Sequence, residues 1–340
     1  MLDDDQARVV AHEDGPAAVL AGAGSGKTRC TTERAARRLT ESGIPADGLL
    51  LLTFTNKAAT EMRARLAQRL PSGQSAPRIG TFHSFGNQLL RSYGRRIDIP
   101  PSATLMDADD AARMIDALMA EPFPDKGERQ GLLRLREQTA AHGLDVTHEA
   151  DVPGVMALCD DAGLDRDRGR RFRSVLRRYE EEKRRAGVLD FADLILLPLR
   201  LLRQETELAQ QLRGQLRDVT VDEAQDTDAG QFRLLRAIAP ASGTVVLVGD
   251  DDQAIYEWRH ARPQNLRDFI EGFGATVYRL ERNYRSTDAI VSSGAHLVRN
   301  NVQRLDKAPF AVRSGEAAPV TLVEYDDGDA MADGVVGRLA

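Results

Sequence analysis

The glycine-rich stretch at residues 21–28, AGAGSGKT, constrains the fold of this chain more than any other feature. It fits the pattern G-x-x-x-x-G-K-[ST], in which backbone N–H groups curl round a phosphate between a strand and the helix that follows it. An apolar run at 17–21 precedes the stretch, and a helical pattern at 29–40 follows it. The sequence therefore predicts an α/β domain with a parallel sheet and a phosphate site at the end of one strand.

The residue types in this stretch predict a nucleotide site. Lys27 is expected to reach the β- and γ-phosphates of ATP, and the Thr28 hydroxyl is expected to hold Mg²⁺. The residues expected to contact the nucleotide here are Gly22, Ala23, Gly24, Ser25, Gly26, Lys27, Thr28 and Arg29.

Two further strand-like runs lead into polar residues of the kind such a site needs. After the run at 219–221, Asp222 is expected to hold Mg²⁺, and Glu223 to orient and deprotonate an attacking water. Taken alone, this segment is also compatible with an acidic surface loop. The run at 245–248 leads toward Gln253, whose amide suits a γ-phosphate sensor. When that segment is taken alone, an ordinary Asp/Gly turn explains it better.

Strand-like and helical patterns alternate at the start of the chain and again after about residue 190. Between them, helical patterns broken by Pro and Gly replace the strand-like runs, which predicts a helical domain inserted into the sheet domain. The predicted boundaries are 1–95 and 190–284 for the two parts of the sheet domain, 96–189 for the insertion, and 285–340 for the start of another domain. The expected strands are 17–21, 49–54, 218–222, 244–249, 276–280 and 319–325, and the expected helices include 29–40, 56–70 and 288–300.

Composition limits the class of protein. The 340 residues are enough for about two or three domains, and no run approaches the ~18 apolar residues of a membrane span. The N-terminus is acidic, unlike a secretory signal, and Cys30 and Cys159 have no paired spacing. We therefore expect a cytoplasmic protein without a membrane partner. The net charge of −6 argues against an all-round nucleic-acid binder but allows a local basic groove.

Seven motifs in a fixed order carry a specific resemblance. They read AGAGSGKT (21–28), LLTFTNKAATEMRARL (51–66), TFHSF (81–85), LDFADL (189–194), VDEAQDTD (221–228), VLVGDDDQAIYEWR (246–259) and LERNYRST (280–287). In content and order these motifs resemble the UvrD/Rep family of superfamily 1 DNA helicases.

This resemblance implies both a fold and an activity. The fold would be a RecA-like P-loop motor domain with a helical insertion, followed by the start of a second RecA-like domain. The activity would be that of an ATP-dependent 3′-to-5′ DNA helicase or single-stranded DNA translocase that uses ATP and Mg²⁺ in DNA repair, replication or recombination. The implied partners are single-stranded DNA, single-strand/double-strand junctions, and a protein partner or a C-terminal half outside this sequence.

The resemblance also assigns residues to the nucleotide. Gln6 would hydrogen-bond the adenine, and Tyr284 would stack on it. Gln253 would couple the γ-phosphate to the DNA groove, and Arg285 would act as an arginine finger that stabilises transition-state charge. Asp3 stands where the family usually has Asn. The expected catalytic set is Lys27, Asp222, Glu223, Gln253 and Arg285.

Further positions match the family's single-stranded DNA site. Phe54, Tyr256 and Trp258 match the base-stacking surface, and aromatic faces beside cations suit sequence-independent binding. The residues that match positions at or near the strand are Thr81, His83 and Arg259. From the residues alone, Phe54 fits a core aromatic equally well, and His83 also fits a structural histidine.

Residues 165–185 carry ten Lys or Arg against five Asp or Glu, a local excess of positive charge in an acidic chain. One interpretation is a DNA-contacting face of the inserted domain. The other is a solvated helix crossed by ion pairs between residues four apart. The sequence leaves both open.

The chain departs from the family pattern at Ala254, where Ser is common, and at His260, where Gly is common. Two later family motifs, one of which supplies a second γ-phosphate arginine, are not recognisable after Asn300. We therefore expect these residues to bind Mg·ATP and DNA but to unwind duplex DNA poorly or not at all alone. The alternative is an ATP-gated DNA-binding or partner-binding module without efficient turnover.

Other enzyme classes fit less well. Asn56 and Lys57 superficially match the N-K-x-D pattern that reads guanine, but Ala59 lacks the required carboxylate. The residues show no metal-nuclease cluster. The forms TFTNKAA and NYRS resemble the DNA branch of these helicases rather than an RNA branch.

Overall fold

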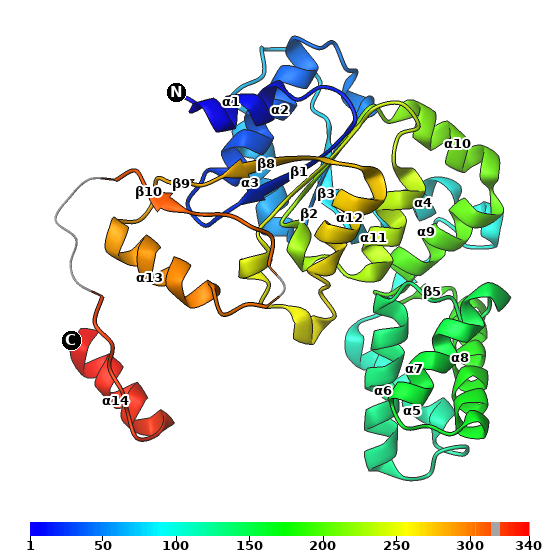
Figure 1. Ribbon diagram of the computed structural model, residues 1–340. Coiled ribbons are helices and arrows are strands. Elements are labelled where there is room, and N and C mark those ends of the chain that lie inside the picture. The colour runs from blue at the N-terminus through cyan, green and yellow to red at the C-terminus, as the bar shows by residue number, and fades with distance from the viewer. Residues whose placement is uncertain (303, 314–319, 340) are drawn as a thin grey trace.

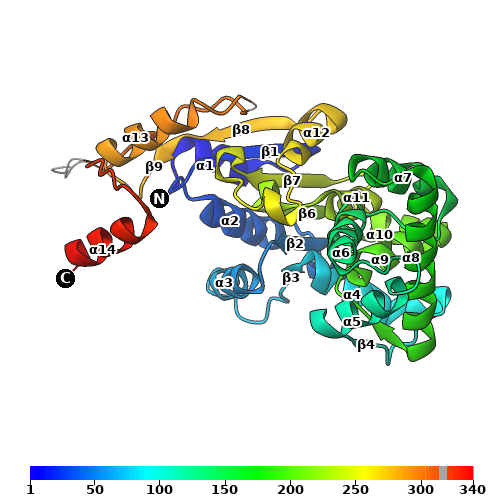
Figure 2. The ribbon, with the colours of Figure 1, turned by 90° about the horizontal axis from the view of Figure 1, so that it is seen from below.

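A six-stranded parallel sheet forms the body of the protein in the computed structural model, which describes residues 1–302, 304–313 and 320–339. Its strands lie in the order β3-β2-β6-β7-β1-β8 (Figure 2). Their bounds are Pro16–Ala21 (β1), Leu49–Thr53 (β2), Arg78–Thr81 (β3), Asp218–Asp222 (β6), Thr244–Gly249 (β7) and Thr276–Leu280 (β8). Every neighbouring pair is parallel, so the predicted α/β class is confirmed.

Helices cover both faces of this sheet because its central strands are apolar on both sides. In β2, Leu49 and Leu51 belong to the core on one face, and Leu50 and Leu52 to the core on the other. The first face is covered by α1 (Asp4–Ala11), α2 (Lys27–Thr40) and α3 (Asn56–Ala67). The second is covered by α4 (Phe82–Tyr93), α9 (Asp193–Gln204), α10 (Thr206–Gln215), α11 (Ala229–Ile238) and α12 (Gln264–Phe273) (Figure 1).

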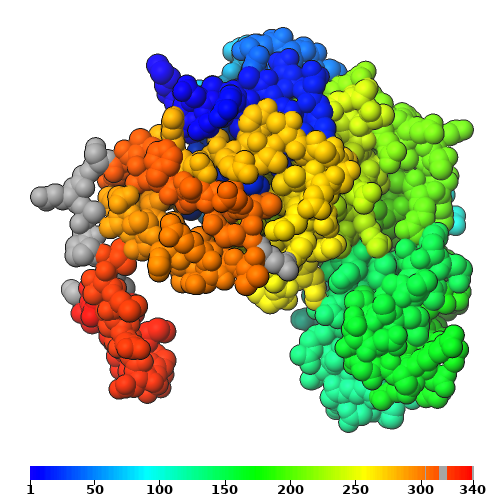
Figure 3. All heavy atoms as spheres, viewed as in Figure 1, coloured from blue at the N-terminus to red at the C-terminus, as the bar shows by residue number. Residues whose placement is uncertain are grey.

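A separate helical lobe lies at the lower right of Figures 1 and 3. It consists of α5 (Ala108–Met119), α6 (Lys126–Ala141), α7 (Val152–Asp161) and α8 (Arg166–Ala186). Its own core includes Phe172 and Tyr179. Its ends are joined by a short ladder of β4 (Thr104–Leu105) and β5 (Val188–Leu189), two strands that the prediction of a mostly helical insertion did not include. Buried Lys183 binds Asp190 and Asp193 at 3.2 and 2.7 Å and so anchors the lobe beside the start of α9.

The chain beyond β8 contains β9 (Arg282–Asn283), α13 (Asp288–Val298), β10 (Phe310–Ala311) and α14 (Gly328–Leu339). Strands β9 and β10 pair in parallel, and α14 lies apart from the body (Figure 1). The prediction of a strand at 319–325 is wrong for residues 320–325, which form no strand. Pro319 lies outside the described residues. A strand needs a neighbour to satisfy its backbone, and within the described residues no strand pairs with this segment.

Elsewhere the predicted elements are confirmed with small shifts at their ends. Helix α2 begins at Lys27 rather than at residue 29, and α3 and α13 end slightly before their expected ends. The sequence patterns missed β3, an edge strand of four residues that is too short to show a period. Among the helices of the described residues, none combines the length and the apolar character that a membrane span requires.

A buried carboxylate ties α2 to the centre of the sheet. Asp218, fully buried at the start of β6, accepts hydrogen bonds from Arg34 at 2.9 and 2.6 Å in a bidentate arrangement. Arg38, one turn later on α2, donates to the same carboxylate at 3.1 Å. These charged groups are removed from water, so each depends on its partner for compensation.

Replacing Arg34 with Met should therefore lower the free energy of unfolding by about 3–5 kcal/mol, because the Asp218 carboxylate loses its bidentate partner while it stays buried. The matched control is Arg37→Met on the same helix, where the guanidinium binds Glu13 and Glu41 near the surface. Its loss should cost about 1 kcal/mol or less. Urea titrations followed by circular dichroism measure both variants. Equal losses of stability in the two variants would show that the contact between Arg34 and Asp218 stabilises the fold no more than a surface ion pair does.

Candidate active site

The glycine-rich stretch leaves β1 at Ala21 and enters α2 at Lys27, at the carboxyl end of the sheet. Gly24 and Gly26 have left-handed backbones, with φ of +73° and +87°, which residues with a side chain adopt only at a cost. Gly26 directly precedes α2, and no side chain caps the helix. The first N–H groups of α2 are therefore available to an anion, where the helix dipole also favours negative charge.

Lys27 forms an ion pair with Glu223 across the ends of α2 and β6, with 2.9 Å between Nζ and Oε2. Glu223 has a left-handed backbone, φ +54°, a conformation that non-glycine residues keep only where the surrounding structure enforces it. Burial raises the pKa of Glu223, but Lys27 and the side chain of Gln225 hold it below its ordinary value. Glu223 is therefore ionised at neutral pH, as a general base must be.

Asp222 ends β6 beside this pair. It is 4% exposed, and its Oδ1 accepts from the backbone N–H of Glu223 at 3.1 Å. Burial and then the neighbouring Glu223 raise the pKa of Asp222 to about 7. Asp226, in the same turn, has a buried Oδ1 without a hydrogen-bond partner among the described residues. The carboxylates of Asp222 and Asp226 are oxygen ligands of the kind that Mg²⁺ prefers.

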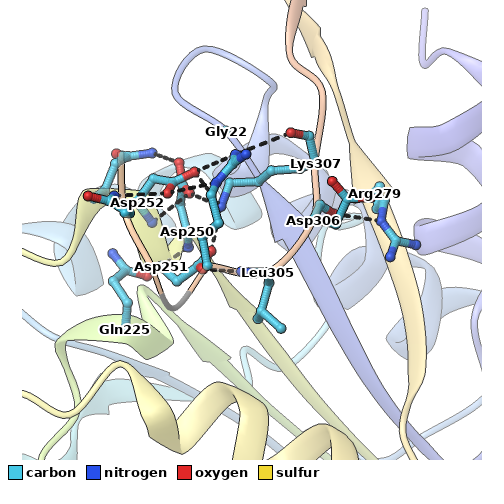
Figure 4. A network of polar contacts seen from close by, with 12 residues as sticks. Gly22, Gln225, Asp250, Asp251, Asp252, Arg279, Leu305, Asp306 and Lys307 are labelled. Atoms are coloured by element: carbon cyan, nitrogen blue, oxygen red, sulfur yellow. Dashed lines mark hydrogen bonds and ion pairs between the residues drawn. The ribbon is translucent and has the colours of Figure 1, made fainter. Parts of the chain in front are cut away.

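Gln225 connects this acidic turn to the end of the next strand. Its amide N–H donates to Glu223 at 2.9 Å, and its Oε1 accepts from the backbone N–H of Asp250 at 3.0 Å. The Asp250 carboxylate in turn accepts from the side chain of Gln253 (Figure 4 shows Gln225 beside this turn). A polar path therefore runs from Lys27 to Gln253. Gln225 was not among the predicted site residues, although a glutamine inside an acidic strand-end motif was a signal in the sequence.

The residues expected at the adenine lie together beside the glycine-rich turn. Gln6, 2% exposed, donates its side-chain N–H to the Ser25 carbonyl at 2.9 Å, and its Oε1 accepts from the backbone of Asp3. Asp3 caps α1, and its carboxylate accepts from the Tyr284 hydroxyl. Asp and Asn are both good helix caps, so the departure from the family pattern at this position preserves the cap.

The turn that carries Arg285 is docked on the glycine-rich stretch. Asn283 donates its side-chain N–H to the Ala23 carbonyl at 2.6 Å, and the Tyr284 N–H donates to the Gly24 carbonyl at 3.0 Å. A Cβ on Gly24 would lie 2.7 Å from the Cβ of Arg285, a distance that real Cβ atoms do not show. The backbone of Arg285 is thus brought to the phosphate loop, while the residue itself remains exposed.

The aromatic residues expected at the DNA form a series beyond Gln253. Phe54, which is half-buried, stacks on Tyr256 with ring centres 5.3 Å apart, and Tyr256 lies 6.3 Å from Trp258. Trp258 is 75% exposed, and the guanidinium of Arg259 lies 5.7 Å from the centre of its ring. Large aromatic rings are seldom this exposed without a function, so the turn is a candidate binding surface.

The start of α4 adds a second pair of rings. His83 stacks on Phe191 with ring centres 4.4 Å apart, and Phe191 is 60% exposed. Burial and the nearby Arg259 lower the pKa of His83 to about 4, so its ring is neutral at pH 7. Thr81 differs, because it is 7% exposed and its hydroxyl accepts from Ser84 as the cap of α4. Phe191 was not among the predicted site residues, although the LDFADL motif that contains it was a signal in the sequence.

The basic segment forms helix α8, and half of its cations are engaged in ion pairs. The ion-paired residues are Arg168, Arg170, Arg173, Lys183 and Arg185. The ion-pair interpretation accounts for these five. A DNA-contacting face remains a prediction for the other arginines of the helix.

The sequence of this chain is similar to those of known proteins. The family model described as UvrD/REP helicase N-terminal domain matches residues 2–274, most of the chain. The chain belongs to this family. It is 34% identical to DNA helicase II of Escherichia coli (strain K12) over 310 residues, which cover 90% of this chain and 41% of the relative.

Two other members of the UvrD/REP family give the same result. ATP-dependent DNA helicase Rep of Salmonella typhimurium is 33% identical over 342 residues, covering 99% of this chain and 49% of that protein. ATP-dependent DNA helicase PcrA of Staphylococcus epidermidis is 31% identical over 320 residues, covering 92% and 42%. The chain therefore spans half or less of the length of the curated relatives it matches.

Gly24→Ala in this UvrD/REP-family site should weaken binding of a fluorescent ATP analogue by about ten-fold or more, because the new Cβ displaces the Arg285 turn and strains the loop. The matched control is Gly43→Ala, which has a similar φ of +66° but open space around it. That variant should lose some stability and bind the analogue normally. Unchanged affinity in Gly24→Ala would mean that the close approach of the Arg285 turn is not needed for nucleotide binding.

Proposed function

We propose that this chain hydrolyses ATP and couples hydrolysis to movement on single-stranded DNA, as part of a 3′-to-5′ DNA helicase. One observation carries the proposal: a continuous polar path leads from Lys27 through Glu223 and Gln225 to the Gln253 turn. That turn continues into the exposed Trp258 surface. The chain thus connects a phosphate site to an aromatic surface, and the names of its relatives include ATP-dependent DNA helicases.

At the nucleotide, the chain's own residues have separable roles. Lys27 would leave Glu223 and bind the β- and γ-phosphates, which frees an ionised carboxylate to take a proton from the attacking water. Arg285 would stabilise negative charge on the transferred phosphoryl group. Mg²⁺, held by Thr28 and Asp222, would neutralise phosphate charge. Gln6 and Tyr284 would bind the adenine, and Gln253 would respond to the γ-phosphate.

At the DNA, stacking and charge would act together. Successive bases would stack on Phe54, Tyr256 and Trp258, and Phe191 on His83 extends this aromatic surface. Arg259 would bind backbone phosphate. None of these contacts reads base identity, so we expect binding with little sequence preference and a strong dependence on salt. The buried position of Thr81 favours a structural role for its side chain.

The proposed domain boundaries are those predicted from the sequence. Residues 1–95 and 190–284 would form the first motor domain, 96–189 the inserted domain, and 285–340 the start of the second motor domain. Strand–duplex junctions are the proposed substrate, with repair, replication or recombination as the setting. Both cysteines, Cys30 and Cys159, are buried and unpaired, which suits a protein of the reducing cytoplasm.

The first test measures steady-state ATP hydrolysis by the purified chain with and without single-stranded DNA. We expect hydrolysis to rise with DNA and to fall by about 100-fold or more in Lys27→Ala and in Glu223→Gln, since each removes a group that acts in the reaction. Glu223→Gln should still bind nucleotide, and the surface variant Glu41→Gln should behave as wild type.

The outcomes of this test separate the assignments. Full hydrolysis by Glu223→Gln would reject Glu223 as the base. Nucleotide binding without any turnover in the unaltered chain would favour the ATP-gated binding module instead.

Trp258→Ala should weaken binding of a fluorescent oligo-dT by about 5- to 100-fold, because an aromatic platform contributes roughly 1–3 kcal/mol per base. The control Leu297→Ala removes a side chain of comparable exposure, 69% against 75%, from helix α13. Fluorescence anisotropy at several salt concentrations measures both. Equal affinities of the two variants for the oligonucleotide would show that single-stranded DNA does not bind at Trp258.

A further inference from the structure

Lys307 places a buried ammonium group among the three carboxylates that follow β7. Its side chain is 4% exposed, and Nζ lies 2.8 Å from an oxygen of Asp250 and 2.8 Å from an oxygen of Asp252. It also pairs with Asp251. Burial would lower the pKa of Lys307, but these carboxylates raise it above its ordinary value, so the ammonium stays charged. Figure 4 shows the side chain pointing into the acidic turn.

The residues just before Lys307 hold the same turn. Arg304 donates to both oxygens of Asp252, at 2.9 and 3.3 Å. The backbone N–H of Leu305 donates to Asp251 at 2.5 Å. The segment between α13 and β10 is therefore fastened to the end of β7 by charge-assisted hydrogen bonds from two side chains and the backbone.

The acidic turn has the geometry of a cation site, because one oxygen of each carboxylate lies within 4.8 Å of the others. Here the cation is the ammonium of Lys307, which contacts all three. The charge of the turn is thus compensated by a distant part of the same chain. The cluster is therefore a contact between the turn after β7 and the segment that carries Lys307.

Asp250 makes this contact relevant to the nucleotide site. One oxygen of its carboxylate binds Lys307, and the other accepts from Gln253. Its backbone N–H donates to Gln225, which binds Glu223. Lys307 therefore constrains the carboxylate that holds Gln253, at the start of the turn that leads to the aromatic surface.

Lys307 also lies in the same small unit as Arg285. Strand β9 pairs with β10, so these two strands and α13 form one unit, to which Arg285 and Lys307 are both attached. The unit meets the site at two points: the Arg285 turn docks at Gly24, and Lys307 docks at the acidic turn. Between them, Arg279 of β8 donates to the Asp306 carbonyl at 2.8 Å and holds the segment in place.

We propose that Lys307 is a positioning residue that ties the Gln253 turn to the unit carrying Arg285, so that both shift together when the nucleotide site opens or closes. The inference rests on the proposed function, since it explains how that function is transmitted. Lys307 contacts neither ATP nor DNA in this proposal. Loss of the tie would uncouple the Trp258 surface from the nucleotide site while each could still bind its ligand.

The single tryptophan of the chain, Trp258, reports on this turn without labelling. In the full 340-residue chain we expect Lys307→Met to lower the steady-state fluorescence anisotropy of Trp258, since the turn loosens. In the wild type we expect a non-hydrolysable ATP analogue with Mg²⁺ to change the Trp258 emission, and the variant should lose that change. Lys307→Arg keeps the charge and should keep both properties. Lys126→Met, an exposed lysine on α6, is the matched control.

A double variant keeps the test decisive if Lys307→Met is unstable. Lys307→Met with Asp251→Asn removes one carboxylate together with the cation, which should restore thermal stability while leaving Trp258 uncoupled from the nucleotide. If the double variant regained the change in Trp258 emission on nucleotide binding, the proposed role of Lys307 would be wrong.

A second measurement separates coupling from stability. Lys307→Met should lower the DNA-stimulated kcat by about ten-fold or more while the KM for ATP changes by less than about three-fold. A wild type that neither binds nor hydrolyses ATP would overturn the proposed function. The anisotropy comparison without nucleotide would still test the contact made by Lys307. Normal wild-type activity, with identical anisotropy, emission response and DNA stimulation in Lys307→Met, would overturn the role of Lys307 alone.

Discussion

The geometry of the nucleotide site depends on how α2 lies against the sheet, and one buried carboxylate controls this. Asp218 receives Arg34 in a bidentate arrangement and Arg38 one turn later, all in the interior. Lys27 begins the same helix, and Glu223 directly follows the strand that Asp218 begins. The 2.9 Å distance between Lys27 and Glu223 therefore depends on the registry of a helix and a strand that are held together far from the phosphates. Buried ion pairs suit this task, since a small shift leaves a charge uncompensated.

Sheet topology gathers the remaining groups. Strands β1, β6 and β7 are neighbours, so their carboxyl ends present the glycine-rich stretch, the acidic turn and the Gln253 turn side by side. Open parallel sheets bind ligands at such ends. The helical lobe interrupts the chain between β3 and β6 without disturbing this order, because it has its own core and is anchored by buried Lys183. The long separation in sequence between these parts of the site is therefore compatible with a single compact centre.

The strand and helix patterns were predictable where the signal is local. Apolar runs of five or six residues identify the central strands, but β3 was too short, and residues 320–325 resembled a strand without having one beside them. Several motif residues lie near one another, and Asp3 connects Gln6 to Tyr284. Phe191 and Gln225 were missed because their roles come from contacts: Phe191 lies against the ring of His83 on α4, and Gln225 bridges two strand ends. His260 takes φ +67°, which accounts for Gly being common there and for the cost of the departure.

The glycine-rich turn, the parallel α/β class and the acidic strand ends were readable from local sequence. Those features depend on the conformational freedom of consecutive glycines and on the period of apolar residues, which act within a few positions. Which charged groups pair with one another follows from tertiary packing. Lys307 lies more than fifty positions from the carboxylates it neutralises, and one lysine in a chain with 46 Lys and Arg carries no mark of its partner. The fold brings Lys307 beside these carboxylates and excludes water from the contact. The buried ammonium group is therefore compensated by the carboxylates.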